Sequence, residues 1–79
     1  MKRNEMSPAE VVIKELGIPT IADALGVNRS TIHRWRYPRP RGSGGRVPSW
    51  YHPDLLQLAQ REGRTLSAED LVLGRARAA

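Results

Sequence analysis

Residues 18–37, with the sequence IPTIADALGVNRSTIHRWRY, constrain the fold of this chain most strongly. Ile21 and Leu25 stand four residues apart, as on one face of a short helix. Gly26 follows where that helix must stop, because glycine readily adopts the left-handed conformation that closes a helix. Asn28 is a good N-cap for a second helix directly after the turn. The stretch therefore predicts a helix-turn-helix.

The second helix, which we expect over residues 28–37, has two different sides on a helical wheel. Its apolar side, which can pack on the preceding helix, carries Thr31, Ile32 and Trp35. Its opposite side is polar and partly cationic, and it carries Arg29, Ser30, His33, Arg34 and Tyr37. Such side chains match the hydrogen-bond donors and acceptors that base edges present in the major groove of DNA. We therefore expect Trp35 in the core and the polar side on DNA.

The motif resembles the helix-turn-helix of the Cro/CI-like (XRE-type) repressor family. The residues that carry the resemblance are Ile21, Ala22, Leu25, Gly26, Val27, Ile32 and Trp35. A small residue four positions before the turn glycine, and apolar residues one, six and nine positions after it, fall where that family has them. The resemblance implies an all-α fold and a DNA-binding regulator. The segment from Trp35 to Pro48 is also similar to short phage or bacterial regulators called carph-isopro proteins.

The whole pattern predicts an all-α fold, a compact bundle of about five short helices in a single domain over residues 1–79. We expect helices over residues 8–16, 20–25, 28–37, 49–61 and 68–73, with Ser7, Thr20, Asn28 and Ser67 as N-caps, and no strands. Residues 38–48 are rich in proline and glycine, so they form a loop. Residues 1–6 and 74–79 are expected to be disordered tails.

Composition argues against several classes of function. The chain has no cysteine, so no disulfide or thiolate metal site can support the fold. His33 and His52 have no carboxylate at metal-ligand spacing, and we expect no metal, no cofactor, no small-molecule substrate and no enzyme activity. No run approaches the roughly 18 apolar residues of a membrane span. These features predict a soluble, cytoplasmic, nucleoid-associated protein.

The net charge of +5 is concentrated in one segment. No acidic residue occurs between Asp23 and Asp54, whereas six arginines do. Arginine suits bidentate contacts with guanine and phosphate. We expect base contacts from Arg29, Ser30, His33 and Arg34. We expect phosphate contacts from Asn28, Arg36, Tyr37, Arg39, Arg41 and Arg46, several of them on the loop 38–48.

The main hypothesis is a sequence-specific regulator that binds double-stranded DNA, with the helix 28–37 in the major groove. A homodimer formed through the helix 49–61 or 68–73 would supply two half-sites. An alternative is an interaction module that recruits polymerase or a phage component and binds DNA weakly. A third reading is a nonspecific architectural protein. The sequence leaves three roles open for Trp50 and Tyr51, namely core packing, anchoring of the loop and a subunit interface.

Overall fold

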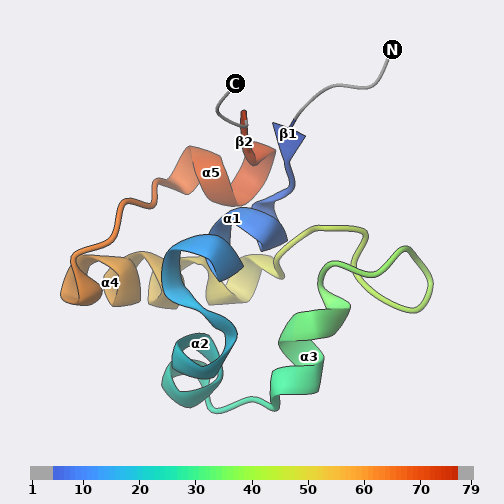
Figure 1. Ribbon diagram of the computed structural model, residues 1–79, viewed down its shortest axis with the longest axis horizontal. Coiled ribbons are helices and arrows are strands. Elements are labelled where there is room, and N and C mark those ends of the chain that lie inside the picture. The colour runs from blue at the N-terminus through green and yellow to red at the C-terminus, as the bar shows by residue number, and fades with distance from the viewer. Residues whose placement is uncertain (1–4, 77–79) are drawn as a thin grey trace.

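The structure is a computed structural model, and it describes residues 5–76. These residues form five α-helices, one short 3-10 helix and one pair of short strands (Figure 1). In chain order they are β1 (Glu5–Met6), α1 (Pro8–Leu16), α2 (Ile18–Leu25), α3 (Arg29–Arg34), η1 (Ser49–Tyr51), α4 (His52–Glu62), α5 (Ala68–Leu73) and β2 (Arg75–Ala76). The predicted all-α class is confirmed in its main feature, a compact bundle of short helices. Within the described residues, no helix has the length and apolar character needed to cross a lipid bilayer.

Helix α1 begins with the capping box that the sequence predicts. The Ser7 amide donates to Glu10 Oε1 at 3.0 Å, and the Glu10 amide donates to Ser7 Oγ at 3.3 Å. Pro8 occupies the first turn, where its missing N–H leaves no hydrogen bond unmade. Gly17 ends the helix, as predicted.

Helix α2 starts earlier than the sequence predicts, at Ile18 rather than after Thr20. Gly17 is the N-cap, and Pro19 lies in the first turn, so the proline belongs to the helix instead of separating it from α1. The predicted N-cap role of Thr20 is therefore wrong. Gly26 closes α2 as predicted, with φ 69° and ψ 34°, a left-handed conformation that suits glycine.

Helix α3 is shorter than the predicted range 28–37, since it covers only Arg29–Arg34. The amides of Trp35, Arg36 and Tyr37 each donate to the carbonyl three residues earlier, which tightens the chain out of α-helical geometry. Pro38 contributes, because a residue before proline is disfavoured in the α conformation. Asn28 is the N-cap as predicted, although its side chain makes no capping hydrogen bond among the described residues.

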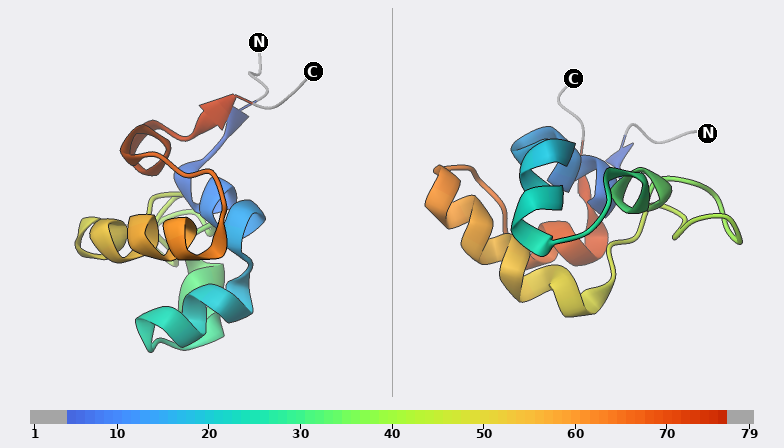
Figure 2. Two further views of the ribbon diagram at one scale, coloured as in Figure 1. Left: turned by 90° about the vertical axis from the view of Figure 1, so that its left-hand side faces the viewer. Right: turned by 90° about the horizontal axis from the view of Figure 1, so that it is seen from below.

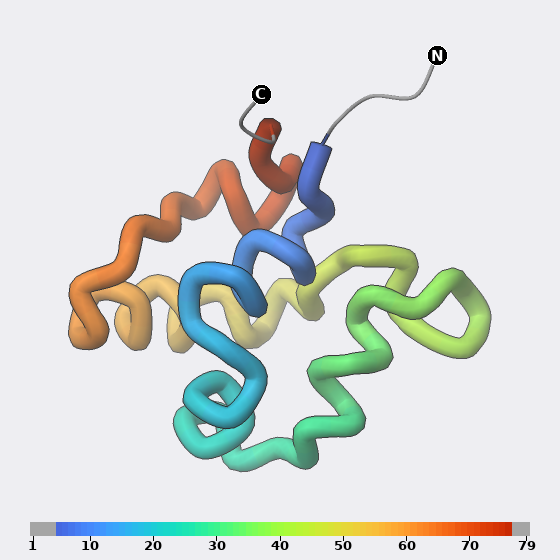
Figure 3. Tube along the Cα trace, viewed as in Figure 1, coloured from blue at the N-terminus to red at the C-terminus, as the bar shows by residue number. Residues whose placement is uncertain are grey.

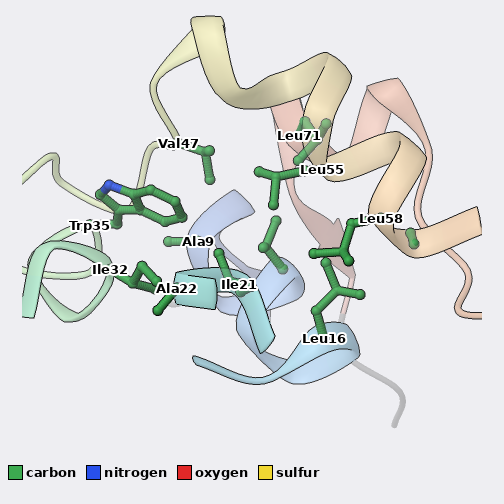
Figure 4. Packing of buried hydrophobic residues seen from close by; sticks show 12 residues of the cluster. Ala9, Leu16, Ile21, Ala22, Ile32, Trp35, Val47, Leu55, Leu58 and Leu71 are labelled. Carbon is green, nitrogen blue, oxygen red and sulfur yellow. The ribbon is translucent and has the colours of Figure 1, made fainter. Parts of the chain in front are cut away.

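The core lies around α1, which packs against α2, α4 and α5 (Figures 1 and 2). Ile21, Ile32, Leu55 and Leu71 are among its most deeply buried aliphatic side chains, each at most 2% exposed. Figure 4 shows how residues from all five helices and Val47 of the loop meet there. Trp35 is only 2% exposed and belongs to this cluster, so its predicted place in the core is confirmed.

The expectation of no strands is wrong, because β1 and β2 pair antiparallel at the two ends of the described chain. Glu5 pairs with Ala76 and Met6 with Arg75, and Met6 is buried. The predicted disorder of 1–6 and 74–79 is therefore wrong for residues 5–6 and 74–76. Residues 1–4 and 77–79 lie outside the described residues.

Arg75 fixes the end of the chain against the helices. Its guanidinium donates to Glu15 Oε2 of α1 at 2.7 Å, to Asp70 Oδ2 of α5 at 2.7 Å and to the Thr65 carbonyl at 3.0 Å. Asp70 also forms the predicted capping box of α5 with Ser67. Hydrogen bonds from Arg75 hold the pKa of Asp70 below its ordinary value of 3.8. Charged hydrogen bonds thus join β2 to α1 and α5, which lie far from each other in the sequence.

Candidate nucleic-acid interface

The outer side of α3 is exposed and polar. Arg29, Ser30 and Arg34 are all exposed, whereas Ile32 and Trp35 on the opposite side are buried. The two sides that the helical wheel predicts are therefore present. Because Ile32 and Trp35 anchor the helix on the core, its polar side is held at a fixed orientation on a rigid element.

His33 lies at the edge of this polar side and is half-buried. Its Nδ1 lies 2.9 Å from Nη2 of Arg36, one turn further on. A guanidinium can only donate, so Nδ1 is the acceptor and the ring proton sits on Nε2. The Nε2–H is then the donor that His33 can offer to a base. Arg36, in turn, is held alongside α3 rather than extended from it.

The loop 38–48 folds back on the end of α3 (Figure 3). The amides of Ser43, Gly44 and Gly45 donate to the carbonyls of Arg34, Tyr37 and Trp35, at the end of α3 and just beyond it. On its other side the loop is joined to α1, because the Ala9 amide donates to the Gly45 carbonyl at 2.9 Å. The loop is therefore built into the fold.

Gly42 is the residue that allows this close approach. A Cβ placed on it would lie 1.9 Å from the Arg34 carbonyl oxygen and 2.6 Å from Tyr37 Cβ. Real side chains do not approach so closely, so any larger residue must displace the loop. Glycine is required at position 42 because there is no space for a side chain, and Gly44 and Gly45 have positive φ angles that favour glycine.

Two adjoining hollows continue the polar side of α3 onto the loop. One, of about 300 Å³, is lined among others by Thr31, Arg34, Arg41 and Ser43. The other, of about 250 Å³, is lined by Tyr37, Pro38, Arg39 and Arg41. Arg41 belongs to both, so the predicted base-contacting residue Arg34 forms one continuous cationic surface with Arg39 and Arg41 of the loop.

Arg46 lines neither of these two hollows. It lines a neighbouring groove with Trp50 of η1 and Val72 of α5. Arg39 lines this groove as well as the smaller hollow, so it stands between the two surfaces. Asn28 is exposed at the other end of α3. The groove and the larger hollow also share Ser43 and Pro48, so they adjoin on the loop, and Arg46 is the predicted phosphate-contacting arginine that lies on the side of η1 and α5.

The charges of this region are not neutralised internally. All six arginines of the segment between Asp23 and Asp54 are exposed. The ion pairs among residues 5–76 join Arg64 and Arg75 to Glu15 and Asp70, and none includes those six. A uniformly cationic surface next to an exposed polar helix face attracts polyanions such as nucleic acids.

No group of three or more histidine, cysteine, aspartate or glutamate residues is arranged to hold a metal ion within residues 5–76. His52, at the start of α4, makes a hydrogen bond of 3.0 Å through Nε2 to the Val47 carbonyl. It thereby joins the loop to α4.

Sequence reasoning missed two features of the molecule. Arg75 lies in a segment expected to be disordered, and nothing local in the sequence indicates its bonds to Glu15 and Asp70. Trp50 is 71% exposed beside Val72, which is 65% exposed. The sequence left Trp50 open between several roles, and the run of apolar residues at the end of α5 was the available signal for an exposed patch.

Comparisons with known proteins do not extend this picture. No protein-family model matches the chain, and neither a curated protein nor a solved structure matches it. Inferences about function therefore depend on the residues and on their arrangement.

Proposed function

We propose that this chain is a sequence-specific regulator that binds double-stranded DNA and resembles the Cro/CI-like (XRE-type) family. The observation that carries the proposal is the pair α2 and α3 around the left-handed Gly26, with the outer side of α3 polar, cationic and exposed. In helix-turn-helix proteins the second helix enters the major groove. Helix α3 has the side chains for that position, and Ile32 and Trp35 hold it in place.

Base contacts on this proposal come from four residues with distinct roles. Arg34 and Arg29 can each donate two hydrogen bonds to O6 and N7 of a guanine. Ser30 can donate to or accept from a base edge. The Nε2–H of His33, left available by its bond to Arg36, can donate to a base acceptor.

Phosphate contacts on this proposal come from residues around α3. Such contacts position the protein on the duplex but do not distinguish one base sequence from another. Arg39, Arg41 and Tyr37 line the hollow next to α3, where a backbone phosphate would meet two guanidinium groups. Asn28 and Arg36 flank the helix at its two ends. If about five phosphates are neutralised, log K falls with log salt at a slope near −4 to −5.

The proposed regulator is a homodimer that is located in the cytoplasm and associated with the nucleoid. One short helix contacts only a few base pairs, so useful specificity requires two half-sites about one helical turn apart. Two copies of α3 would supply them.

The test uses Arg34→Ala with Arg61→Ala as the matched control. Arg61 is also exposed, but it lies on α4 beside Asp23 and Glu62, whose carboxylates repel phosphate. We expect Arg34→Ala to weaken binding to a selected site by about 1–3 kcal/mol and to relax one base preference. Arg61→Ala should leave both properties unchanged.

A second candidate function is recruitment of another protein, such as polymerase or a phage component. The exposed Trp50 and Val72 favour it, because a contiguous apolar patch is typical of protein interfaces. On this alternative Arg34→Ala changes no site preference, since there is none. A nonspecific architectural protein would lose affinity with salt but would likewise show no base preference.

A further inference from the structure

The apolar surface that this chain leaves exposed is concentrated in one place. Among the described residues, the large hydrophobic side chains that are exposed are Tyr37, Trp50, Val72 and Leu73. Trp50 and Leu73 are each 71% exposed. Three of the four lie on η1 and at the end of α5, away from α3. Tryptophan is highly buried on average, so an exposed one that shares a groove with the exposed Val72 indicates an interface.

A groove of about 470 Å³ runs between these elements. Trp50 lines it from η1, Leu71 and Val72 line it from α5, and Arg39 and Arg46 line it from the loop. Its charged side chains are both cationic and exposed, and no carboxylate lines it. Neither arginine has an ion-pair partner among residues 5–76. The groove therefore suits a segment that is apolar and acidic.

Helix α5 of this chain has an exposed side that is both apolar and acidic. Glu69, Val72 and Leu73 are spaced at i, i+3 and i+4, so they share one side of the helix, and all three are exposed. Asp70 and Leu71 point elsewhere, because Asp70 binds Arg75 and Leu71 is buried. The outward face of α5 thus carries one carboxylate and two aliphatic side chains, with no ion-pair partner for Glu69 among the described residues.

We propose that the groove binds α5 of a second copy of this chain. Val72 and Leu73 of one copy would pack on Trp50 of the other, while Glu69 would pair with Arg46. Because α5 also forms one wall of the groove, a two-fold axis makes the same contacts twice, as an isologous dimer requires. The charges favour this occupant, since a cationic groove and an acidic helix face lie side by side on one molecule.

This inference depends on the dimer part of the proposed function and not on its DNA part. It also gives Arg46 a role that agrees with its position away from α3. In this arrangement Arg46 contributes to DNA binding only by holding the dimer together, whereas Arg39 and Arg41 remain beside α3.

The test is a charge exchange measured without DNA by analytical ultracentrifugation. Wild-type protein at about 100 µM should be dimeric, since a dimer with a micromolar dissociation constant is mostly formed there. Glu69→Arg alone and Arg46→Glu alone each place like charges in both copies of the contact, and each should raise the dissociation constant at least tenfold. An equimolar mixture of the two variants restores opposite charges at both contacts and should form a heterodimer.

The matched controls are Glu62→Arg and Arg61→Glu, which make the same charge changes on α4 outside the groove. Both should remain dimeric. Recovery of the dimer in the mixture also demonstrates that each variant is folded, and circular dichroism of the single variants confirms it.

Three results would overturn the inference. Wild-type protein that stays monomeric at this concentration would show that no second copy binds the groove. Single variants whose dissociation constant rises less than tenfold over wild type would place the dimer interface elsewhere. A mixture that fails to dimerise, with both variants folded, would exclude the pairing of Glu69 with Arg46. None of these results bears on base contacts, which Arg34→Ala tests separately.

Discussion

Gly42→Ala should destabilise the fold by opening the loop 38–48 away from α3. The added Cβ would lie 1.9 Å from the Arg34 carbonyl oxygen, so the loop must move. That movement breaks the bond from the Ser43 amide to Arg34, and the bond from the Gly42 amide to Pro38 at 3.0 Å. Two such bonds contribute about 2 kcal/mol together. The lower entropy of alanine in the unfolded chain offsets about 0.5 kcal/mol of this.

The expected net loss of about 1.5 kcal/mol corresponds to a fall in melting temperature of roughly 6–12 °C for a domain of this size. Thermal unfolding followed by circular dichroism measures it. Ser43→Ala is the matched control, because it keeps the Ser43 amide bond to Arg34 and should change the free energy of unfolding by less than about 0.5 kcal/mol. A Gly42→Ala protein that melts within a degree or two of wild type would refute the packed loop.

Two further predictions concern the charged groups. Arg75→Met removes the guanidinium that binds Glu15, Asp70 and the Thr65 carbonyl, and should lower the free energy of unfolding at pH 7 by about 2 kcal/mol in urea titrations. Arg64→Met, which loses a longer and more exposed pair with Glu15, should cost less than about 1 kcal/mol. Because the pKa of folded Asp70 is below its ordinary 3.8, the stabilisation by Arg75 is present above about pH 4 and is lost as the pH falls through that lower pKa. A constant difference between Arg75→Met and wild type down to about pH 2 would contradict this account. Replacing both Arg39 and Arg41 with alanine should reduce the slope of log K against log salt by about 2, measured by fluorescence anisotropy on labelled duplex. An unchanged slope would show that these arginines do not contact DNA phosphates.

Local chemistry in the sequence was sufficient to predict most helix ends. Ser7 with Glu10, and Ser67 with Asp70, satisfy amides within one turn, so four consecutive residues of sequence determine each capping box. Gly26 is similarly local, because its left-handed conformation depends on the missing side chain. The helical periodicity of residues 28–37 is also a local feature, and it correctly placed Ile32 and Trp35 in the core.

The misplaced start of α2 is a local error, because Pro19 fits the first turn of that helix. Other errors came from interactions between segments that are distant in the sequence. The bond from Arg75 to Glu15 spans sixty residues, and neither residue indicates the other. Beyond Arg34 the chain tightens ahead of Pro38, and the returning loop supplies the Ser43 amide to the Arg34 carbonyl, a contact that a helical wheel cannot register. The candidate site was predicted as one set of arginines, and only the folded loop shows that Arg46 lines the groove beside η1 and α5 whereas Arg34 and Arg41 line the adjoining hollow beside α3.

Selection from a random duplex library at near-physiological salt, with sequencing of the bound pool, tests the central proposal most directly. Specific binding by α3 predicts an enriched motif that contains guanine, and a homodimer predicts two inverted half-sites about one helical turn apart. Arg34→Ala should lose the preference at one position of each half-site. Measurable binding without any enriched motif would contradict sequence-specific recognition by this protein.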